Sequence, residues 1–258
     1  LDGNSKVTTA AALGTGNAGS VEVTATGSLL LRNNSLIDSS TFSAGQGGQV
    51  KVRAGDITID SSSAISSLAI SGGSGNSGSI DVQSSGDLVL SNGGSIVVST
   101  STAGNAGQIS IAANNVRVST GGLISTATLG GAINTGNAGS IAIQAGGAVT
   151  ITDGYFSSST FSSGVAGAVE VTAKNIDITG SRSRIDAVAG EGSSGQTGTV
   201  SLRASDSIAL SNGAQVLTSN SASLSGTARP ASTLLSLAAP RITLAGNAWV
   251  SSVSTGNL

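Results

Sequence analysis

Cysteine, histidine and methionine are all missing from the 258 residues of this chain. Without cysteine there is no disulfide scaffold and no thiol chemistry, and without either cysteine or histidine the usual zinc ligand sets are excluded. The absence of histidine also removes the imidazole that general acid–base sites use most often. Because the chain starts at Leu1 and has no methionine, we expect it to be a mature segment, a proteolytic piece or the ordered part of a larger protein.

Charged and aromatic residues are scarce. Charged residues make up 9% of the chain and aromatic residues 2%, and the formal net charge is −2. With no run of basic residues, we expect no nucleic-acid partner. No apolar run reaches about 18 residues and no basic-plus-apolar leader is present, so the sequence predicts neither a membrane span nor a signal peptide. Tyr155 and Trp249 are expected to project outward, but they form no row of the kind that sugar-binding surfaces usually display.

Glycine is abundant, with 38 residues, and much of it lies in a repeat. Seven G-x-x-G tetrads begin at Gly16, Gly45, Gly75, Gly104, Gly136, Gly164 and Gly195, at intervals of 29, 30, 29, 32, 28 and 31 residues. A near-constant period of this length indicates one structural unit repeated along an axis. Because each unit can bury its apolar face only against its neighbours, we predict one continuous solenoid over residues 1–258.

Each tetrad is followed by the same alternation of apolar and polar residues. The first apolar pair occurs at Val21/Val23, Val50/Val52, Ile80/Val82, Ile109/Ile111, Ile141/Ile143, Val169/Val171, Val200/Leu202 and Leu235/Leu237, the last without a tetrad. The second occurs at Leu29/Leu31, Ile57/Ile59, Leu88/Leu90, Val116/Val118, Val149/Ile151, Ile176/Ile178, Ile208/Leu210 and Ile242/Leu244. A third apolar position follows at Ile37, Ile65, Ile96, Ile124, Phe156, Ile185, Val216 and Val250.

Alternation with a period of two and many β-branched residues is typical of strands. Three short strands in every ~30 residues, separated by Gly, Ser and Asn, predict one turn of a three-faced coil. The sequence therefore predicts an all-β fold, a parallel β-helix of about eight coils with three strands per coil. An antiparallel sandwich would not need a fixed register across seven copies, and a propeller blade usually needs ~40 residues and four strands.

Two columns of the tetrad are nearly invariant along the chain. The fourth position is always glycine, at Gly19, Gly48, Gly78, Gly107, Gly139, Gly167 and Gly198. The second position is an amide in six of the seven copies, at Asn17, Gln46, Asn76, Asn105, Asn137 and Gln196, and is interrupted by Val165. A corner repeated at one place needs a positive φ or a close backbone approach, which glycine allows. We expect the stacked amides to hydrogen-bond from coil to coil.

The repeats resemble those of a known group of proteins. Segments such as GNAGSVEVTATGSLLLRNNSLIDSST and GNSGSIDVQSSGDLVLSNGGSIVVST resemble the repeat region of large secreted bacterial exoproteins, the filamentous-haemagglutinin-like passengers of two-partner secretion. The resemblance covers essentially the whole chain. It implies export to an extracellular or bacterial cell-surface location, a long right-handed β-helix shaft, and a role in adhesion or surface structure.

Few charged residues form candidate sites. Glu22, Lys51 and Asp81 are expected to face outward on neighbouring coils and to form an ion-pair ladder that supports the register. The densest charge lies in the sixth coil, at Lys174, Asp177, Arg182, Arg184, Asp186 and Glu191. We expect Asp177 and Asp186 to face outward and to form a candidate ligand patch with Arg182 and Arg184. Two carboxyls held at a fixed distance are the signature of a glycosidase, but the neighbouring bases favour a solvated salt-bridge cluster here. The tetrads carry amides where a calcium-binding β-roll has aspartate, so we expect no metal site and no cofactor.

The remaining predictions concern a loop and the two ends of the chain. Residues 219–233 break the rhythm and contain Pro230, which predicts a surface loop insertion. Residues 1–13 are interpreted as the third strand of a preceding coil, with Val7 at the core position. Because open strand edges invite pairing, we expect the solenoid to continue end to end, in a longer polypeptide or by stacking of copies.

The sequence thus favours a non-enzymatic, rod- or fibre-forming segment of a secreted bacterial surface protein, with a host or environmental glycan or a cell surface as a further partner. The alternatives are a carbohydrate-active β-helix enzyme, a polysaccharide lyase or hydrolase, and a glycan-binding module. A face that binds ice or mineral would need a regular outward array of threonine, and the outward columns are too mixed for that.

Overall fold

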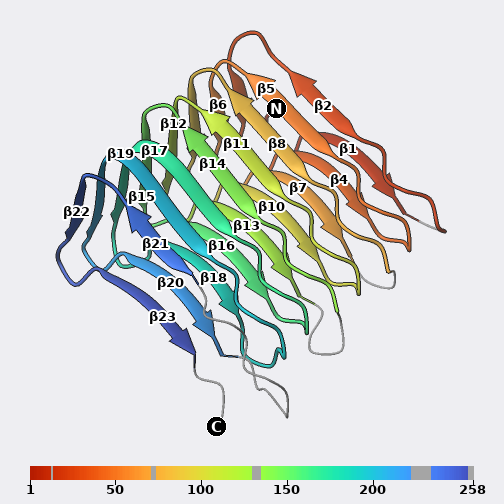
Figure 1. The fold of residues 1–258 in the computed structure, drawn as a ribbon. Helices are drawn as coiled ribbons and strands as arrows, with labels where there is room; N and C mark the ends of the chain where they lie inside the picture. Colours follow the sequence, from red (N-terminus) through yellow and green to blue (C-terminus); the bar gives the residue numbers. More distant parts are fainter. Residues whose placement is uncertain (13, 71–73, 130–134, 222–233, 255–258) are drawn as a thin grey trace.

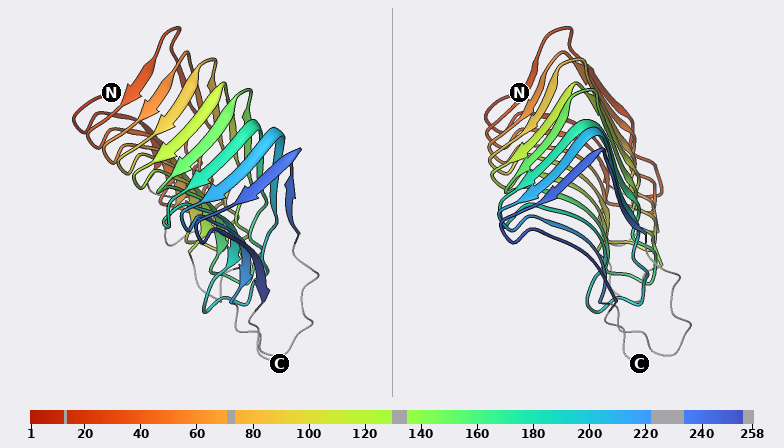
Figure 2. Two further views of the ribbon diagram at one scale, coloured as in Figure 1. Left: turned by 90° about the vertical axis from the view of Figure 1, so that its left-hand side faces the viewer. Right: turned by 60° about the vertical axis from the view of Figure 1, so that its left-hand side comes forward.

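The structure is a stack of parallel coils. The computed structural model describes residues 1–12, 14–70, 74–129, 135–221 and 234–254, and the regular elements in these ranges are all β-strands. Figure 1 shows the coils side by side along one axis, with β1 near one end and β23 at the other, and Figure 2 shows the same stack from two further directions. The chain completes about seven turns of about 31 residues each. The predicted all-β fold and parallel solenoid are confirmed.

Each coil contributes strands to two sheets. The third strand of every coil lies in a nine-stranded sheet formed by β1 (Lys6–Ala11), β4 (Leu36–Thr41), β7 (Ala64–Ala69), β10 (Ser95–Thr100), β13 (Leu123–Thr128), β16 (Tyr155–Thr160), β18 (Arg184–Ala189), β20 (Gln215–Asn220) and β23 (Trp249–Ser254). The first and second strands together form a sheet of 14 strands.

In this second sheet the first strands are β2 (Val21–Thr24), β5 (Val50–Ala54), β8 (Ile80–Ser84), β11 (Ile109–Ala113), β14 (Ile141–Ala145) and β21 (Leu235–Ala238). The second strands are β3 (Leu29–Leu31), β6 (Ile57–Ile59), β9 (Asp87–Leu90), β12 (Asn115–Ser119), β15 (Ala148–Thr152) and β22 (Arg241–Leu244). In two coils the first and second strands are continuous, as β17 (Val169–Thr179) and β19 (Val200–Ser211), so the expected turn between them is a bend there.

The register joins equivalent residues of successive repeats. Val21 pairs with Val50, and Val50 pairs with Ile80, with all three strands parallel. Because side chains alternate along a strand, this register places every apolar pair on the same side of the sheet. Each strand inside the stack therefore bonds to the coil on either side, and the only strands in the described ranges with one neighbour are those of the end coils.

The core is a narrow column of Val, Ile and Leu side chains, most of them fully buried. Phe156 is the largest fully buried side chain and stands in the column that elsewhere carries mostly isoleucine. At the ends the same columns open to solvent. Val7, which pairs with the fully buried Ile37 as expected, is 37% exposed, and Ile242, which pairs with the fully buried Ile208, is 43% exposed. These side chains lack a coil on one side.

The turn between the second and third strands relies on left-handed backbone conformations. Asn92 and Gly93 have φ angles of 48° and 78°, and Asn212 and Gly213 have 55° and 80°. Asn and Gly adopt this conformation at low steric cost, which explains why these dipeptides recur there. Of the predicted insertion at 219–233, Ser219 and Asn220 belong to β20, and residues 222–233 lie outside the described residues.

Candidate functional site

The glycines of the tetrad lie against the backbone of the neighbouring coil. A Cβ atom added to Gly139 would lie 1.7 Å from the carbonyl oxygen of Gly107, and one added to Gly107 would lie 2.2 Å from that of Gly78. The same contact, at 1.9 or 2.1 Å, occurs at Gly48, Gly78, Gly167 and Gly198. None of these φ angles is positive, so close approach of the backbones explains the glycine column. Gly19 in the first coil is the exception, since its nearest neighbour is Thr9 at 3.6 Å.

The asparagines of the amide column each accept a hydrogen bond through Oδ1 from the backbone N–H of the next coil. The backbone N–H of Gln46 donates to Oδ1 of Asn17 (2.9 Å), that of Asn105 to Asn76 (2.7 Å) and that of Asn137 to Asn105 (2.8 Å). Val165 continues this pattern as a donor, because its own N–H binds Oδ1 of Asn137 at 2.8 Å.

The valine interrupts the pattern only at the following coil. Val165 has no side-chain acceptor, and the N–H of Gln196 donates instead to the carbonyl of Gly164 at 3.2 Å. Among the described residues, the side chain of Gln46 makes no such bond to the next coil, so the longer glutamine also breaks the series.

Buried hydroxyls complete the tetrad corner, and the sequence reading did not find them. Ser39 donates to the carbonyl of Gly19 (2.6 Å), and Ser158 donates to that of Gly139 (3.0 Å). In several coils a second buried hydroxyl, such as that of Ser43, Thr102 or Ser162, stands two residues before a tetrad. Ser162, for example, accepts a bond from the N–H of Gly164 (3.1 Å) and donates to the carbonyl of the preceding tetrad (2.7 Å). These hydroxyls satisfy backbone groups that the glycine corners leave without strand partners.

The expected ion-pair ladder forms around a different base. Arg53, which lies next to Lys51 on the outer face of β5, contacts Glu22 at 3.1 Å and Asp81 at 3.6 Å. Its Nε also donates to Oε1 of Gln83 at 3.2 Å. The longer and planar guanidinium reaches the coils on both sides, whereas Lys51 makes no ion pair within the described residues.

The predicted ligand patch is divided between the two sheets. Asp177 lies on β17 in the sheet of 14 strands, Arg182 is exposed in the turn that follows, and Arg184 and Asp186 lie on β18 in the sheet of nine strands. The expectation that Asp186 faces solvent is wrong, because its side chain is completely buried. Ser157 donates to its carboxylate at 2.6 Å, and Arg184 forms an ion pair with it. The two carboxylates proposed as a pair therefore belong to different surfaces.

Burial decides the titration of Asp186. Desolvation raises the pKa of this carboxyl above its ordinary value, against the opposing effects of the Arg184 charge and the Ser157 hydroxyl. Asp87 behaves in the opposite way, since hydrogen bonds, first from Asn115 and then from Arg117, lower its pKa.

These directions predict opposite effects of pH on stability. A raised pKa in the folded state means that the fold disfavours the charged form of Asp186. The contribution of Asp186 to the free energy of unfolding therefore falls as the pH rises from the ordinary aspartate pKa through the raised pKa. The stabilising contribution of Asp87 is lost as the pH falls through the lowered pKa of this carboxyl. We expect Asp186→Asn to flatten the loss of stability between acidic and neutral pH, and Asp87→Asn to flatten the loss below the ordinary aspartate pKa. Urea unfolding at several pH values measures both; equal pH profiles for the two variants would contradict the assignment.

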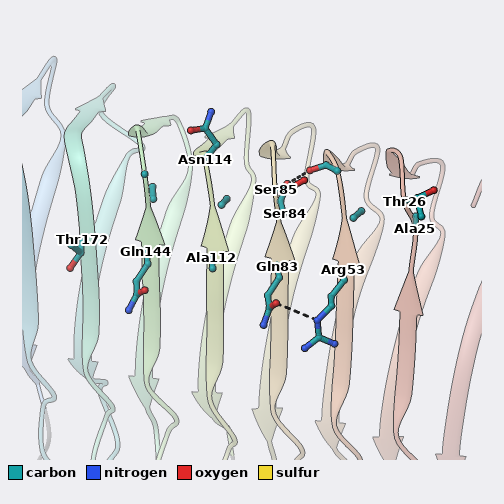
Figure 3. Close-up of a pocket in the computed structure, with 15 residues that line it drawn as sticks. Ala25, Thr26, Arg53, Gln83, Ser84, Ser85, Ala112, Asn114, Gln144 and Thr172 are labelled. Atoms are coloured by element: carbon teal, nitrogen blue, oxygen red, sulfur yellow. Dashed lines mark hydrogen bonds between the residues drawn. The ribbon is translucent and has the colours of Figure 1, made fainter.

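A shallow groove of about 910 Å³ follows the bend between the first and second strands (Figure 3). One wall carries Arg53, Gln83, Ala112 and Gln144, which are neighbours in register on successive strands. Small residues form the floor, and turn residues such as Asn114 form the other wall. The sequence reading missed this surface because its residues belong to six different repeats.

Comparison with protein-family models, with curated proteins and with solved structures finds no match to this chain. Within the described ranges there is no helix with the length and hydropathy of a membrane span. The same ranges contain no group of three or more His, Cys, Asp or Glu side chains placed to hold a metal ion.

Proposed function

We propose that this chain is a structural segment of a bacterial extracellular surface protein of the filamentous-haemagglutinin-like kind, a rod that spaces or displays other parts and continues end to end. The observation that carries the proposal is the unbroken parallel register from β1 to β23. In such a stack every inner strand is bonded on both edges, an arrangement that resists unfolding and proteolysis.

The ends of the described structure support continuation of the rod. The outer edges of β1 at one end and β23 at the other have no strand beside them in the described ranges, and the core side chains at both ends are partly exposed. A further β-helical rung would pair these edges and cover Val7 at one end and Ile242 at the other. Strand addition of this kind provides affinity through main-chain hydrogen bonds. The partner is a copy of the chain or further β-helix of a longer polypeptide.

Electron microscopy of the native material tests the proposal. We expect rods clearly longer than the roughly 40 Å that the nine strands from β1 to β23 span at a strand spacing of about 4.8 Å. A denaturing gel then separates the two forms of continuation, since a longer polypeptide migrates as one large chain and stacked copies migrate as the single chain. Native particles that all have the 24.6 kDa mass of an isolated monomer would contradict end-to-end continuation.

A further inference from the structure

The groove along the bend is long, and it runs parallel to the axis of the stack. Its lining begins at Ala25 and Thr26 after β2 and ends at Thr172 in β17, so it crosses six successive strands. Five steps between strands at about 4.8 Å give a length of roughly 24 Å. A site of this shape suits a segment of an extended polymer better than a compact small molecule.

We propose that this groove binds a neutral, extended β-1,4-linked polysaccharide that lies along the stack axis. The inference does not depend on the rod function proposed above, because it concerns the side of the coils and not their ends.

The spacing of the polar groups matches such a chain. Gln83 and Gln144 lie two strands apart in the same column, with the small Ala112 between them. This places the two amides about 10 Å apart at the strand spacing. In a β-1,4-linked chain each sugar is turned over relative to the one before, so equivalent hydroxyls recur at every second sugar. Two amides separated by one alanine can therefore bind equivalent hydroxyls while the ring between them passes over Ala112.

The charges around the groove favour a neutral chain over an acidic one. Arg53 is the charged residue in the lining, and its guanidinium already contacts Glu22 and Asp81. Lys51 lies in register between the same two acids. An acidic sugar would thus meet bases whose charge is already balanced, and it would be repelled by the two carboxylates.

The amides differ in how firmly they are held. Gln83 accepts a bond from Arg53 and donates to Asp81 at 3.2 Å, which fixes the orientation of its amide and lowers the entropy cost of binding. Gln144 is exposed and makes no side-chain hydrogen bond within the described residues, so both its donor and its acceptor are available. Amides that can donate and accept are well matched to sugar hydroxyls, which do both.

The floor of the groove sets the strength of binding. Ala54 and Ala145, each 8% exposed, present small apolar surfaces, and the lining contains no aromatic ring on which a sugar could stack. Each sugar therefore contributes little, and the affinity should grow with the number of sugars until the groove is filled. At the length of the groove this limit is roughly five sugars.

Calorimetric or NMR titration with neutral β-1,4-linked glucose, mannose and xylose oligomers of two to eight sugars tests the proposal. We expect at least one hexasaccharide to bind with a dissociation constant below about 10 mM, with affinity rising to about five sugars and then levelling off. An oligogalacturonate of equal length should bind more weakly. Failure of all three hexasaccharides to bind, or tighter binding of the acidic oligomer, would overturn the proposal, and so would tighter binding of an extended polyalanine peptide.

Substitutions locate the binding on the groove. Gln144→Ala removes one neutral hydrogen-bonding group and should weaken binding about fivefold to tenfold. Ala112→Glu fills the space between the two amides and should abolish binding. Ser110→Glu is the matched control, because it adds the same charge on the same outer face of β11 outside the groove. All three positions are exposed, and the midpoint of thermal unfolding verifies that each variant is folded. Equal binding by Ala112→Glu and Ser110→Glu would exclude the groove as the site.

Discussion

Gly139→Ala is expected to destabilise the protein by about 3 kcal/mol or more, enough to prevent folding of the coils around it. The added Cβ would lie 1.7 Å from the carbonyl oxygen of Gly107 and 2.6 Å from its carbonyl carbon. Neither atom can move freely, because both belong to the backbone of a tetrad that is bonded to the coils on either side. The carbonyl groups of these glycines also accept hydrogen bonds from buried hydroxyls. Thr126 and Ser158 both donate to the carbonyl oxygen of Gly139. Urea unfolding followed by circular dichroism measures the effect.

Gly19→Ala is the control for this prediction, since Gly19 occupies the same column in the first coil. Its nearest neighbour is Thr9 at 3.6 Å, an ordinary contact, and its φ is not positive. The substitution should leave the stability within about 1 kcal/mol, because a glycine-to-alanine change without strain acts mainly on the unfolded chain. If both alanines had the same effect, the close approach between tetrads could not be the reason for the glycine column.

The period of the tetrads and the apolar alternation were sufficient to predict the coil, the register and the core. These features repeat, and each repeat is independent evidence for the same local geometry. Val21, Val50 and Ile80 pair as the spacing requires. The end of β20 was harder to predict, because the repeat pattern stops there and no other sequence feature marks where the strand ends.

What the sequence could not provide is contact between side chains of different coils. Arg53 and Lys51 are equivalent by pattern, and only the reach of the guanidinium decides which one bridges two acids. Asp186 follows the alternation that predicts exposure, yet Ser157 and Arg184 bind its carboxylate and it is buried. A signal for the hydroxyl columns was present, since Ser43, Thr102 and Ser162 all stand two residues before a tetrad, but they resemble ordinary turn residues unless their burial is known.

Phe156→Ala should cost about 3–5 kcal/mol, the usual effect of removing a buried phenylalanine from a packed core. Phe156 is the largest fully buried side chain and stands between Ile124 and Ile185 in the column of third-strand core positions. Strands on both sides fix the backbone, so the coils cannot close over the cavity that alanine would leave. Phe156→Ile, which matches the neighbouring positions of the column, should recover part of the loss because it refills part of the volume.

The exposed Phe42 provides the matched control for Phe156. It is 50% exposed, and Phe42→Ala should change the free energy of unfolding by less than about 1 kcal/mol. The denaturation midpoints of the three variants then order the positions, with Phe156→Ala lowest, Phe156→Ile next and Phe42→Ala close to the parent protein. A Phe156→Ala variant as stable as Phe42→Ala would mean that the interior of this coil is not packed as the register requires, since a fully buried ring cannot be removed from a close-packed column without loss.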